Sequence, residues 1–518
     1  MSQHLTISPP WLSSQSSALA QCVGVIGAGT MGAGIAQVAA AAGHPVRLMD
    51  VRPDAARAAR ENIAVALAGL VGKGRMSASQ RDAILERIVP VEALRDLADA
   101  ALVVEVIVEN LAAKQRLLRE LETHVDRHAI LASNTSSISI TALANGMAYP
   151  DRVVGMHFFN PVPSMKLVEV VSGAETAVTV ADAIAALSRR WGKQPVHAKS
   201  TPGFIVNRIA RPFYAEALAL LQEQAATPQQ LDRLARSAGF RMGPCELMDL
   251  IGHDINYAVT VSVFDANYGD RRYVPSLVQK ALLDGGRLGR KCGKGLYDDA
   301  PTALPALLPS SAPAALEIVG KGALMSQLTD WFSGKNVAFS RSVERHWNGL
   351  QISLPGGAAE LHISDGRSAA QLSAECGTRV LGVIDLPLLS EHSDAIGIAF
   401  APGVTSEERS AMSAALAACG LQALEMRDMP GLLIARTVAM LINEGADAVH
   451  QGVCDEAGVD LAMKLGTNYP AGPFQWLQLV GVDYTVDLLN HLFSAYRSER
   501  YRISPLLQQR FWTQRVPT

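Results

Sequence analysis

Residues 22–50 read CVGVIGAGTMGAGIAQVAAAAGHPVRLMD. The pattern predicts a short apolar strand at Cys22–Ile26, a glycine-rich turn, a helix of small residues over 33–42, and a second strand that ends at Asp50. The turn has the spacing G-x-G-x-x-G. Alone, such a motif is weak evidence. Between a strand and a helix, with an acid at the end of the second strand, it is specific for a dinucleotide-binding fold.

The three glycines of the turn have separate physical roles. Gly27 permits the tight turn, Gly29 lets the backbone approach a pyrophosphate, and Gly32 lets the helix pack closely on the strand. Unpaired N–H groups at the helix N-terminus attract the phosphate anion. The residues predicted to bind the cofactor at this turn are Gly27, Gly29, Thr30, Met31 and Gly32.

Asp50 predicts which cofactor is used. Its carboxylate can accept hydrogen bonds from the ribose hydroxyls and would repel a 2′-phosphate, so NAD is favoured over NADP. Arg47 and Arg52 are near in sequence and keep NADP open as the alternative.

Length and composition limit the remaining possibilities. A chain of 518 residues is expected to form two to four domains, and its net charge of −3 argues against nucleic acid or an anionic membrane as the main partner. Residues 1–20 lack a basic start and an apolar centre, so we expect a disordered leader and no signal peptide. The six scattered cysteines contain no CxxC pair, which fits reduced thiols in a cytoplasm and no metal site.

The alternation of strands and helices continues downstream, as a doubly wound parallel sheet requires. An apolar strand over 102–108 ends at Glu109, and Ile130–Ser133 runs into the polar residues 134–137. Polar side chains at the carboxyl ends of parallel strands are where ligands bind in this architecture. Of Ser136 and Ser137, we expect one to cap a helix over 138–144 and the other to face a substrate.

A histidine and a glutamate follow in the stretch 153–171, VVGMHFFNPVPSMKLVEVV. The pattern predicts a strand that stops near His157, a proline-rich loop, and a second strand that carries Glu169. The two side chains can then meet across the turn, as a general base and the group that orients it. A core histidine paired with a buried acid is the alternative.

These motifs together resemble the L-3-hydroxyacyl-CoA dehydrogenases over residues 22–297. The resemblance rests on the glycine turn, the run 108–114 (VENLAAK), residues 133–137, the stretch from His157 to Glu169, and the run 201–208 (TPGFIVNR). The form it resembles most is the long bacterial one of phenylacetate degradation, associated with 3-hydroxybutyryl-CoA or 3-hydroxyadipyl-CoA oxidation.

The resemblance implies roles for individual residues. His157 would take the proton of the substrate 3-hydroxyl, and Glu169 would orient the imidazole. Ser136 and Asn207 would contact the substrate oxygen. The implied NAD contacts beyond the glycine turn are Asp50, Glu109, Lys114, Asn134, Asn160 and Lys291. Lys73 falls where the family places a lysine on the CoA moiety, although an ordinary solvated loop lysine is the alternative.

After residue 207 the pattern is helical, and the family implies a homodimer through these helices. The second half of the chain repeats the first. The run 430–436 (PGLLIAR) echoes 202–208, and Glu444 echoes Glu216 at the same offset. A second helical domain is therefore predicted at the C-terminal end.

A fainter echo upstream predicts a shortened, degenerate dinucleotide-type fold over about 314–427, with chance similarity of short apolar runs as the alternative. Ile384 stands where His157 would be, Gly397 at the position of Glu169, and Met325 at the third glycine. Ala435 stands at the position of Asn207. The copy lacks the chemical residues, so we predict no second NAD site and no second catalytic centre.

The predicted fold class is α/β: a doubly wound Rossmann-type NAD domain, an all-α domain, and a degenerate second copy ending in another all-α domain. The predicted boundaries are a leader at 1–20, the NAD domain at 21–199, helices at 200–297, a linker at 298–315, the degenerate Rossmann-like domain at 316–427 and helices at 428–518. The predicted function is NAD-dependent oxidation of an L-3-hydroxyacyl-CoA in the cytoplasm. A same-fold dehydrogenase of a free hydroxy acid (gulonate-type) and a non-enzymatic nucleotide-binding protein are the alternatives.

Overall fold

The computed structural model describes residues 21–298, 315–354 and 357–516. The chain divides into two compact units, the first of residues up to 207 together with Gly452–Gly466, the second of Arg208–Gln451 and the residues from 467 onward. The predicted leader at 1–20, and all of the predicted linker except its end residues 298 and 315, lie outside the described residues. Within the described part of the chain, no helix is both long enough and apolar enough to cross a membrane.

The first unit is built on an eight-stranded sheet with the order β3-β2-β1-β4-β5-β6-β7-β8. Its strands are β1 (Cys22–Ile26), β2 (Val46–Met49), β3 (Ile88–Val91), β4 (Ala100–Glu105), β5 (Ile130–Ser133), β6 (Val153–Phe158), β7 (Leu167–Ser172) and β8 (Gln194–Lys199). All neighbouring strands are parallel except β6 and β7, which are antiparallel. The order reverses between β1 and β4, the point at which this architecture binds its ligands.

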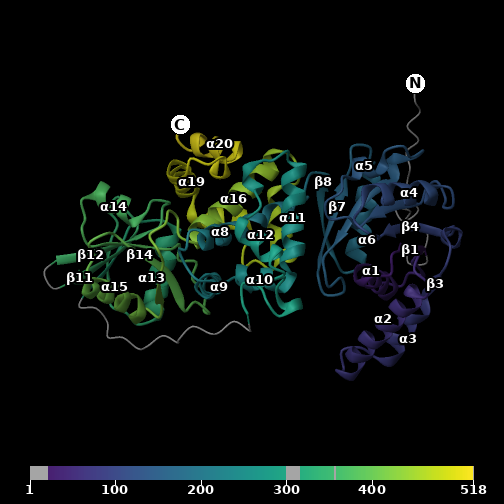
Figure 1. The fold of residues 1–518 in the computed structure, drawn as a ribbon, viewed down its shortest axis with the longest axis horizontal. Helices are drawn as coiled ribbons and strands as arrows, with labels where there is room; N and C mark the ends of the chain where they lie inside the picture. The colour runs from purple at the N-terminus through teal and green to yellow at the C-terminus, as the bar shows by residue number, and fades with distance from the viewer. Residues whose placement is uncertain (1–20, 299–314, 355–356, 517–518) are drawn as a thin grey trace. The chain divides into compact units, whose positions relative to one another are not determined.

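The helices of the first unit are α1 (Thr30–Ala41), α2 (Ala55–Gly72), α3 (Ala78–Arg87), α4 (Leu111–Glu122), α5 (Ile140–Ala144) and α6 (Val178–Arg190). The small residues of α1 allow it to pack closely on the sheet, and Ile35, Ala36 and Ala39 are fully buried there. Helices α2 and α3 lie side by side and extend away from the sheet (Figure 1).

Residues 452–466, which we placed in the second helical domain, group with the first unit in the structure. They include nearly all of α17 (Glu456–Thr467). The backbone N–H of Lys199, at the end of the edge strand β8, donates to the carbonyl of Val453 at 2.8 Å. A Cβ on Gly458 would lie only 2.9 Å from Val196, so a glycine allows this close approach. The segment thus covers an otherwise open sheet edge.

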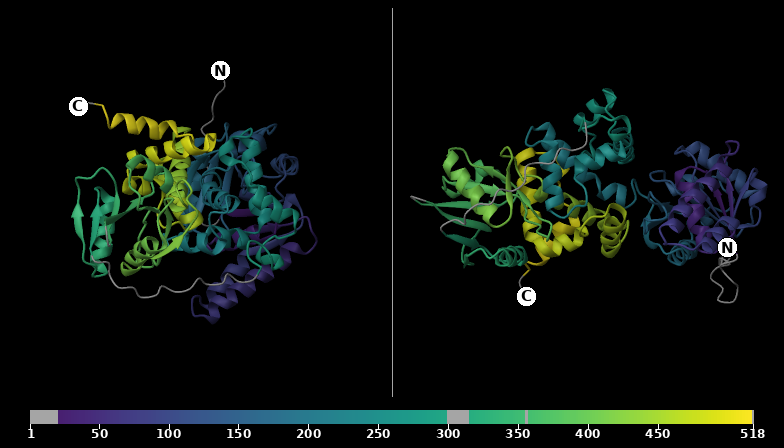
Figure 2. Two further views of the ribbon diagram at one scale, coloured as in Figure 1. Left: turned by 60° about the vertical axis from the view of Figure 1, so that its left-hand side comes forward. Right: turned by 90° about the horizontal axis from the view of Figure 1, so that it is seen from below.

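The second unit contains two helical groups that pack against each other, teal and yellow in Figures 1 and 2. The first has α8 (Arg211–Gln222), α9 (Pro228–Ser237), α10 (Pro244–Ile251), α11 (His253–Ala266) and α12 (Leu277–Asp284). The second has α16 (Ile434–His450), α18 (Pro473–Val480), α19 (Val482–Tyr496) and α20 (Pro505–Thr513). The short α7 (Val206–Ile209) spans the boundary between the units.

The second unit also holds a seven-stranded sheet with the order β10-β9-β11-β12-β13-β14-β15. Its strands are β9 (Leu316–Val319), β10 (Ser340–Ser342), β11 (Gly349–Leu354), β12 (Gly357–Ile363), β13 (Leu381–Ile384), β14 (Ala395–Phe400) and β15 (Gln422–Glu425), with helices α13 (Ala323–Gly334), α14 (Ala369–Cys376) and α15 (Ser406–Ala418).

This second sheet is a shortened copy of the first. Gly320, after β9, has a φ of +108°, the same as Gly27 after β1, and a helix follows in both places. Strands β13 and β14 are antiparallel, as β6 and β7 are, and β14 and β15 are parallel, as β7 and β8 are. The copy differs in β11, which runs antiparallel to both its neighbours and reaches β12 with no intervening helix. The predicted fold class is confirmed.

Candidate active site

The glycine turn forms a cradle at the carboxyl end of β1. A Cβ on Gly32 would lie 1.7 Å from the carbonyl oxygen of Gly27, so only glycine permits this approach of helix to turn. A Cβ on Gly29 would meet no atom within 4 Å, so that side of the turn is open. No side chain caps the N-terminus of α1. Thr30 and Met31 are its first residues, and the free N–H groups fit a pyrophosphate.

Asp50 lies beside this turn. Its carboxylate accepts the backbone N–H of Ala28 at 2.7 Å and pairs with the Arg52 guanidinium at 2.9 Å. The hydrogen bond from Arg52 lowers the pKa of Asp50 to about 2. Arg47 instead pairs with Asp99 at 3.2 Å. A cavity of about 860 Å³ adjoins the turn and Asp50, a size that suits an adenosine moiety.

A buried ion-pair network lies at the carboxyl ends of β4 and β5. Lys114 is 1% exposed, and its ammonium lies 2.8 Å from Glu105 and 3.4 Å from Glu109. Burial opposes ionisation of Glu109, but hydrogen bonds from Thr135 and the charge of Lys114 outweigh it and lower the pKa. The Glu109 side chain is partly exposed, whereas that of Lys114 is buried. Direct contact of Lys114 with NAD stays a prediction.

Ser136 and Ser137 both bind Glu109. Their hydroxyls lie 3.4 and 3.1 Å from its carboxylate, which also accepts both backbone N–H groups. The expectation that one of them caps the following helix is wrong, because α5 begins at Ile140 and its cap is Ser139. The role of Ser136 toward a substrate stays a prediction. Asn134 accepts the N–H of Phe158 at 2.8 Å and so fixes β5 to β6.

His157 and Glu169 are directly paired across β6 and β7. Nδ1 of His157 lies 2.5 Å from Oε2 of Glu169, and the prediction that the two side chains meet is confirmed. The other carboxylate oxygen accepts the backbone N–H groups of Ile205 (3.1 Å) and Val206 (2.9 Å). Nε2 of His157 has no hydrogen-bond partner among the described residues, and the ring packs between Phe159 and Phe204. With Nδ1 donating to Glu169, Nε2 of the neutral ring is an acceptor.

The other predicted site residues lie in different settings. Asn207 follows Val206 directly, in α7. Asn160 is exposed at the end of β6 and lines a second cavity of about 570 Å³. Lys73 is the exposed residue that directly follows α2. Lys291 belongs to the second unit and pairs with Asp254 at 2.5 Å, so its contact with NAD stays a prediction.

The sequence reasoning missed two charged residues of the first unit. Glu105, the last residue of β4, is fully buried and holds both Lys114 and Ser133. Lys193 is buried beside the loop that joins β6 to β7. Glu105 has a signal, an acid within an apolar strand, whereas Lys193 has none.

Comparison with known proteins agrees with this geometry. The sequence model for the 3-hydroxyacyl-CoA dehydrogenase NAD binding domain matches residues 22–201, and that for the C-terminal domain of the same enzymes matches both 203–299 and 431–518. The chain belongs to the 3-hydroxyacyl-CoA dehydrogenase family. It is an NAD-dependent oxidoreductase. A third model, the 3-hydroxybutyryl-CoA dehydrogenase reduced Rossmann-fold domain, matches 361–430, within the degenerate copy.

Individual members of the 3-hydroxyacyl-CoA dehydrogenase family resemble either nearly all of the chain or about half of it. The 3-hydroxyadipyl-CoA dehydrogenase of Escherichia coli is 42% identical over 95% of this chain and 97% of its own. A crystal structure of 3-hydroxybutyryl-CoA dehydrogenase from Escherichia coli covers 96% of this chain and 99% of its own, with a TM-score of 0.86 and 40% identity. A probable 3-hydroxybutyryl-CoA dehydrogenase of Bacillus subtilis is 40% identical over 53% of this chain and 96% of its own.

Proposed function

We propose that this dehydrogenase oxidises the 3-hydroxyl of an L-3-hydroxyacyl-CoA of the 3-hydroxybutyryl or 3-hydroxyadipyl type, with His157 as the general base. The observation that carries the proposal is the pair itself. His157 is fixed by Glu169 through Nδ1, while Nε2 is left as an acceptor at the end of a strand.

The chain supplies geometry and a base. Bound NAD would accept the hydride from the 3-carbon. Nε2 of His157 takes the hydroxyl proton, and the Glu169 carboxylate stabilises the imidazolium that forms. The two backbone N–H groups on Glu169 hold its carboxylate in place during this charge change. In the reverse direction the imidazolium returns the proton to the ketone oxygen.

A CoA arm fits the cavity of about 570 Å³ in the first unit. Its walls come from α1, α2 and the loop that begins at Asn160, and small residues such as Gly34 and Ala59 leave a mostly apolar space. Lys73 stands at the end of α2, where an ammonium can meet a CoA phosphate. These features favour a CoA thioester over the free hydroxy acid of a gulonate-type enzyme.

The replacement His157→Ala tests the base. We expect kcat to fall by about 10²–10⁴-fold, the range for loss of a general base, while NAD affinity stays near that of the wild type. Rates should be measured by NADH absorbance with 3-hydroxybutyryl-CoA, 3-hydroxyadipyl-CoA and a free 3-hydroxy acid. Wild-type rates in the variant would refute the assignment of His157. A preference of the wild type for the free acid would refute the CoA substrate.

The homodimer through the helical domains stays a prediction. Within one chain, α8 and α16 already pack on each other, joined by the buried pair of Glu216 and Arg436 at 2.8 Å. A dimer would therefore use other faces of these helices. Light scattering on the purified chain measures the mass directly. The cytoplasmic location also stays a prediction, resting on the unpaired cysteines of the described residues.

A further inference from the structure

Lys193 is a buried cation with no carboxylate partner. It follows α6, one residue before β8, and is 6% exposed. Its ammonium donates to the carbonyl oxygens of Val162 and Met165, the latter at 2.8 Å. In the part of the chain that the structure describes, no carboxylate lies within ion-pair distance of it. Burial lowers its pKa. An ammonium is costly to bury, so a lysine here needs a reason beyond packing.

The two carbonyls belong to the loop that links the predicted catalytic strands. This loop runs from Asn160, after β6, to Met165, before β7. Inside it, the N–H groups of Ser164 and Met165 both donate to the carbonyl of Pro161, so the loop is a compact turn. Lys193 holds that turn from the side of β8.

The opposite side of the loop rests on the cofactor-binding helix. Val162 packs on Gly34 of α1 so closely that a Cβ there would lie 2.8 Å from the valine Cβ. The loop residues 160–163 form one wall of the cavity of about 570 Å³, and the glycine turn and α1 form another. The position of the loop therefore sets both the width of this cavity and the place of Asn160.

A charged side chain is well suited to hold the 160–165 loop in place. An ammonium has three donors and binds two carbonyls at once, whereas an apolar side chain of similar length, such as that of methionine, would leave both carbonyls unpaired. Its attraction for the carbonyl dipoles is strengthened in a site that excludes water. Lys193 thus fixes the turn at two points, Val162 and Met165, from a position next to the first residue of β8.

We propose that Lys193 is a positioning residue for the dehydrogenase reaction, whose ammonium anchors the 160–165 loop and thereby sets Asn160 and the wall of the acyl-CoA cavity. This inference rests on the proposed function. Lys193 touches neither the reacting atoms nor the glycine turn. Its loss should therefore lower the rate and weaken binding of the acyl-CoA substrate, and it should affect NAD binding only as far as Asn160 shifts.

The test compares Lys193→Met with Lys199→Met. Lys199 ends strand β8, which begins directly after Lys193, and its side chain is exposed, so its replacement removes the same charge without touching the loop. In Lys193→Met we expect kcat/KM for the acyl-CoA to fall by about 100-fold, through both a higher KM and a lower kcat. Hydrogen exchange of the Ser164 and Met165 amides should become faster. Lys199→Met should behave as the wild type in both measurements.

A merely structural lysine gives a different result. Stability would fall, while kcat and KM per folded molecule, and the exchange of the two loop amides, would stay at wild-type values; that outcome overturns the proposal. If Lys193→Met does not fold, Lys193→Gln replaces it, because a single amide can still reach one carbonyl and should give a smaller change in the same direction. If the wild type oxidises no 3-hydroxyacyl-CoA, the proposed function fails, and amide exchange still tests the anchor.

Discussion

The two sheets each use one buried carboxylate to hold the start of the helical segment that follows. In the first copy, Glu169 accepts the N–H groups of Ile205 and Val206. In the second copy, Asp385, directly after β13, accepts the corresponding N–H groups of Leu433 and Ile434, at 2.9 and 2.7 Å. Only the first carboxylate also holds a histidine. Holding the segment is therefore separable from the chemistry.

The carboxylate of the second copy comes from a different strand. Glu169 lies within β7, whereas Asp385 directly follows β13, the strand that corresponds to β6. Gly397 lies on the strand that corresponds to β7 and leaves space for the Asp385 side chain. A Cβ on Gly397 would lie 3.4 Å from the Cβ of Asp385. The carboxylate that accepts the N–H groups of the helical segment therefore comes from the neighbouring strand in the second copy. Ile384 stands there at the position of His157. The second copy thus has a buried carboxylate that binds its helical segment, but no histidine beside it.

The largest effect is expected on kcat, when the Glu169 carboxylate is removed. Removal of the Asp385 carboxylate is the matched comparison. We expect Glu169→Gln to lower kcat by about 10²–10⁴-fold, because the imidazolium loses its counter-charge. We expect Asp385→Asn to leave kcat near the wild-type value and to destabilise the second unit, because an amide NH₂ would face N–H donors. Steady-state kinetics and urea unfolding measure the two. A large fall in kcat for folded Asp385→Asn would break the comparison.

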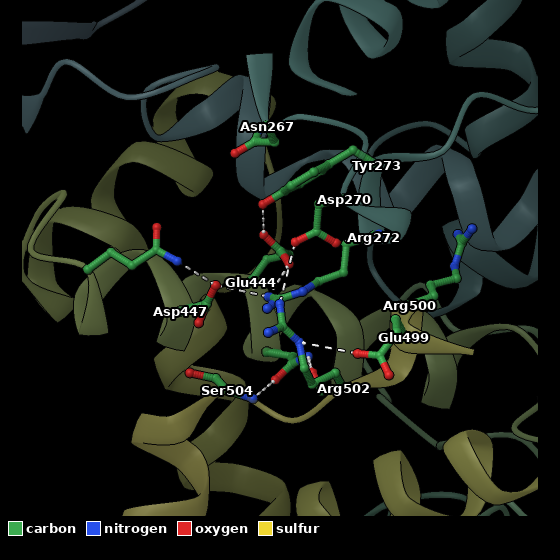
Figure 3. A network of polar contacts seen from close by, with 12 residues as sticks. Asn267, Asp270, Arg272, Tyr273, Glu444, Asp447, Glu499, Arg500, Arg502 and Ser504 are labelled. Carbon is green, nitrogen blue, oxygen red and sulfur yellow. Dashed lines mark hydrogen bonds and ion pairs between the residues drawn. The ribbon is translucent and has the colours of Figure 1, made fainter. Parts of the chain in front are cut away.

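Each of the two helical segments that these carboxylates bind continues into an arginine that forms a buried salt bridge with the helical group of the other copy. Arg208, in the first segment, pairs with Glu444 and with Asp447 at 3.0 Å. Arg436, in the second, pairs with Glu216 at 2.8 Å. A tyrosine and a second arginine complete each half, and the half around Glu444, with Tyr273 and Arg272, is seen in Figure 3. Both copies keep this set of salt bridges, including the one in which Ile384 and Ala435 stand at the positions of His157 and Asn207.

Removing one arginine should reduce stability more than activity. Arg436 is fully buried, and Arg436→Met leaves Glu216 with only Arg500 and Tyr501. Breaking a buried pair on one side costs about 3–5 kcal/mol. Adding Glu216→Gln should restore part of this loss, because the uncompensated charge is then gone. Chemical unfolding of the two variants checks both points. A double variant no more stable than Arg436→Met alone would contradict the idea that the loss of stability comes from the unpaired charge of Glu216.

The sequence predicted the features that are local. The glycine turn and the meeting of His157 with Glu169 follow from strand periodicity and a short loop, and the echo of Glu216 in Glu444 was visible as a repeat. What it did not predict depends on distant partners. Lys193 binds carbonyls 28 and 31 positions away, which leave no side-chain signal. The position matching Glu169 is Gly397, so alignment concealed the carboxylate supplied by Asp385.

The smallest effect expected from the comparison is a pH dependence of stability. Asp385 is fully buried, and burial raises its pKa to about 6 despite four backbone N–H donors, from Leu386, Leu433, Ile434 and Ala435. A carboxyl whose pKa is higher in the folded state than in the unfolded state binds a proton more tightly when folded. Its contribution to stability is therefore full below the unfolded pKa of about 4 and is lost as the pH rises through about 6.

Asp385→Asn isolates this contribution from other groups that titrate in the same range. The difference in free energy of unfolding between the wild type and the variant should shrink as the pH rises from about 4 to 6, and then stay level. Urea unfolding at several pH values across this window measures it. A difference that grows with pH would mean that the four N–H donors outweigh burial and keep Asp385 ionised. The second copy would then hold its segment with a charge, and the comparison with Glu169 would reduce to the missing histidine.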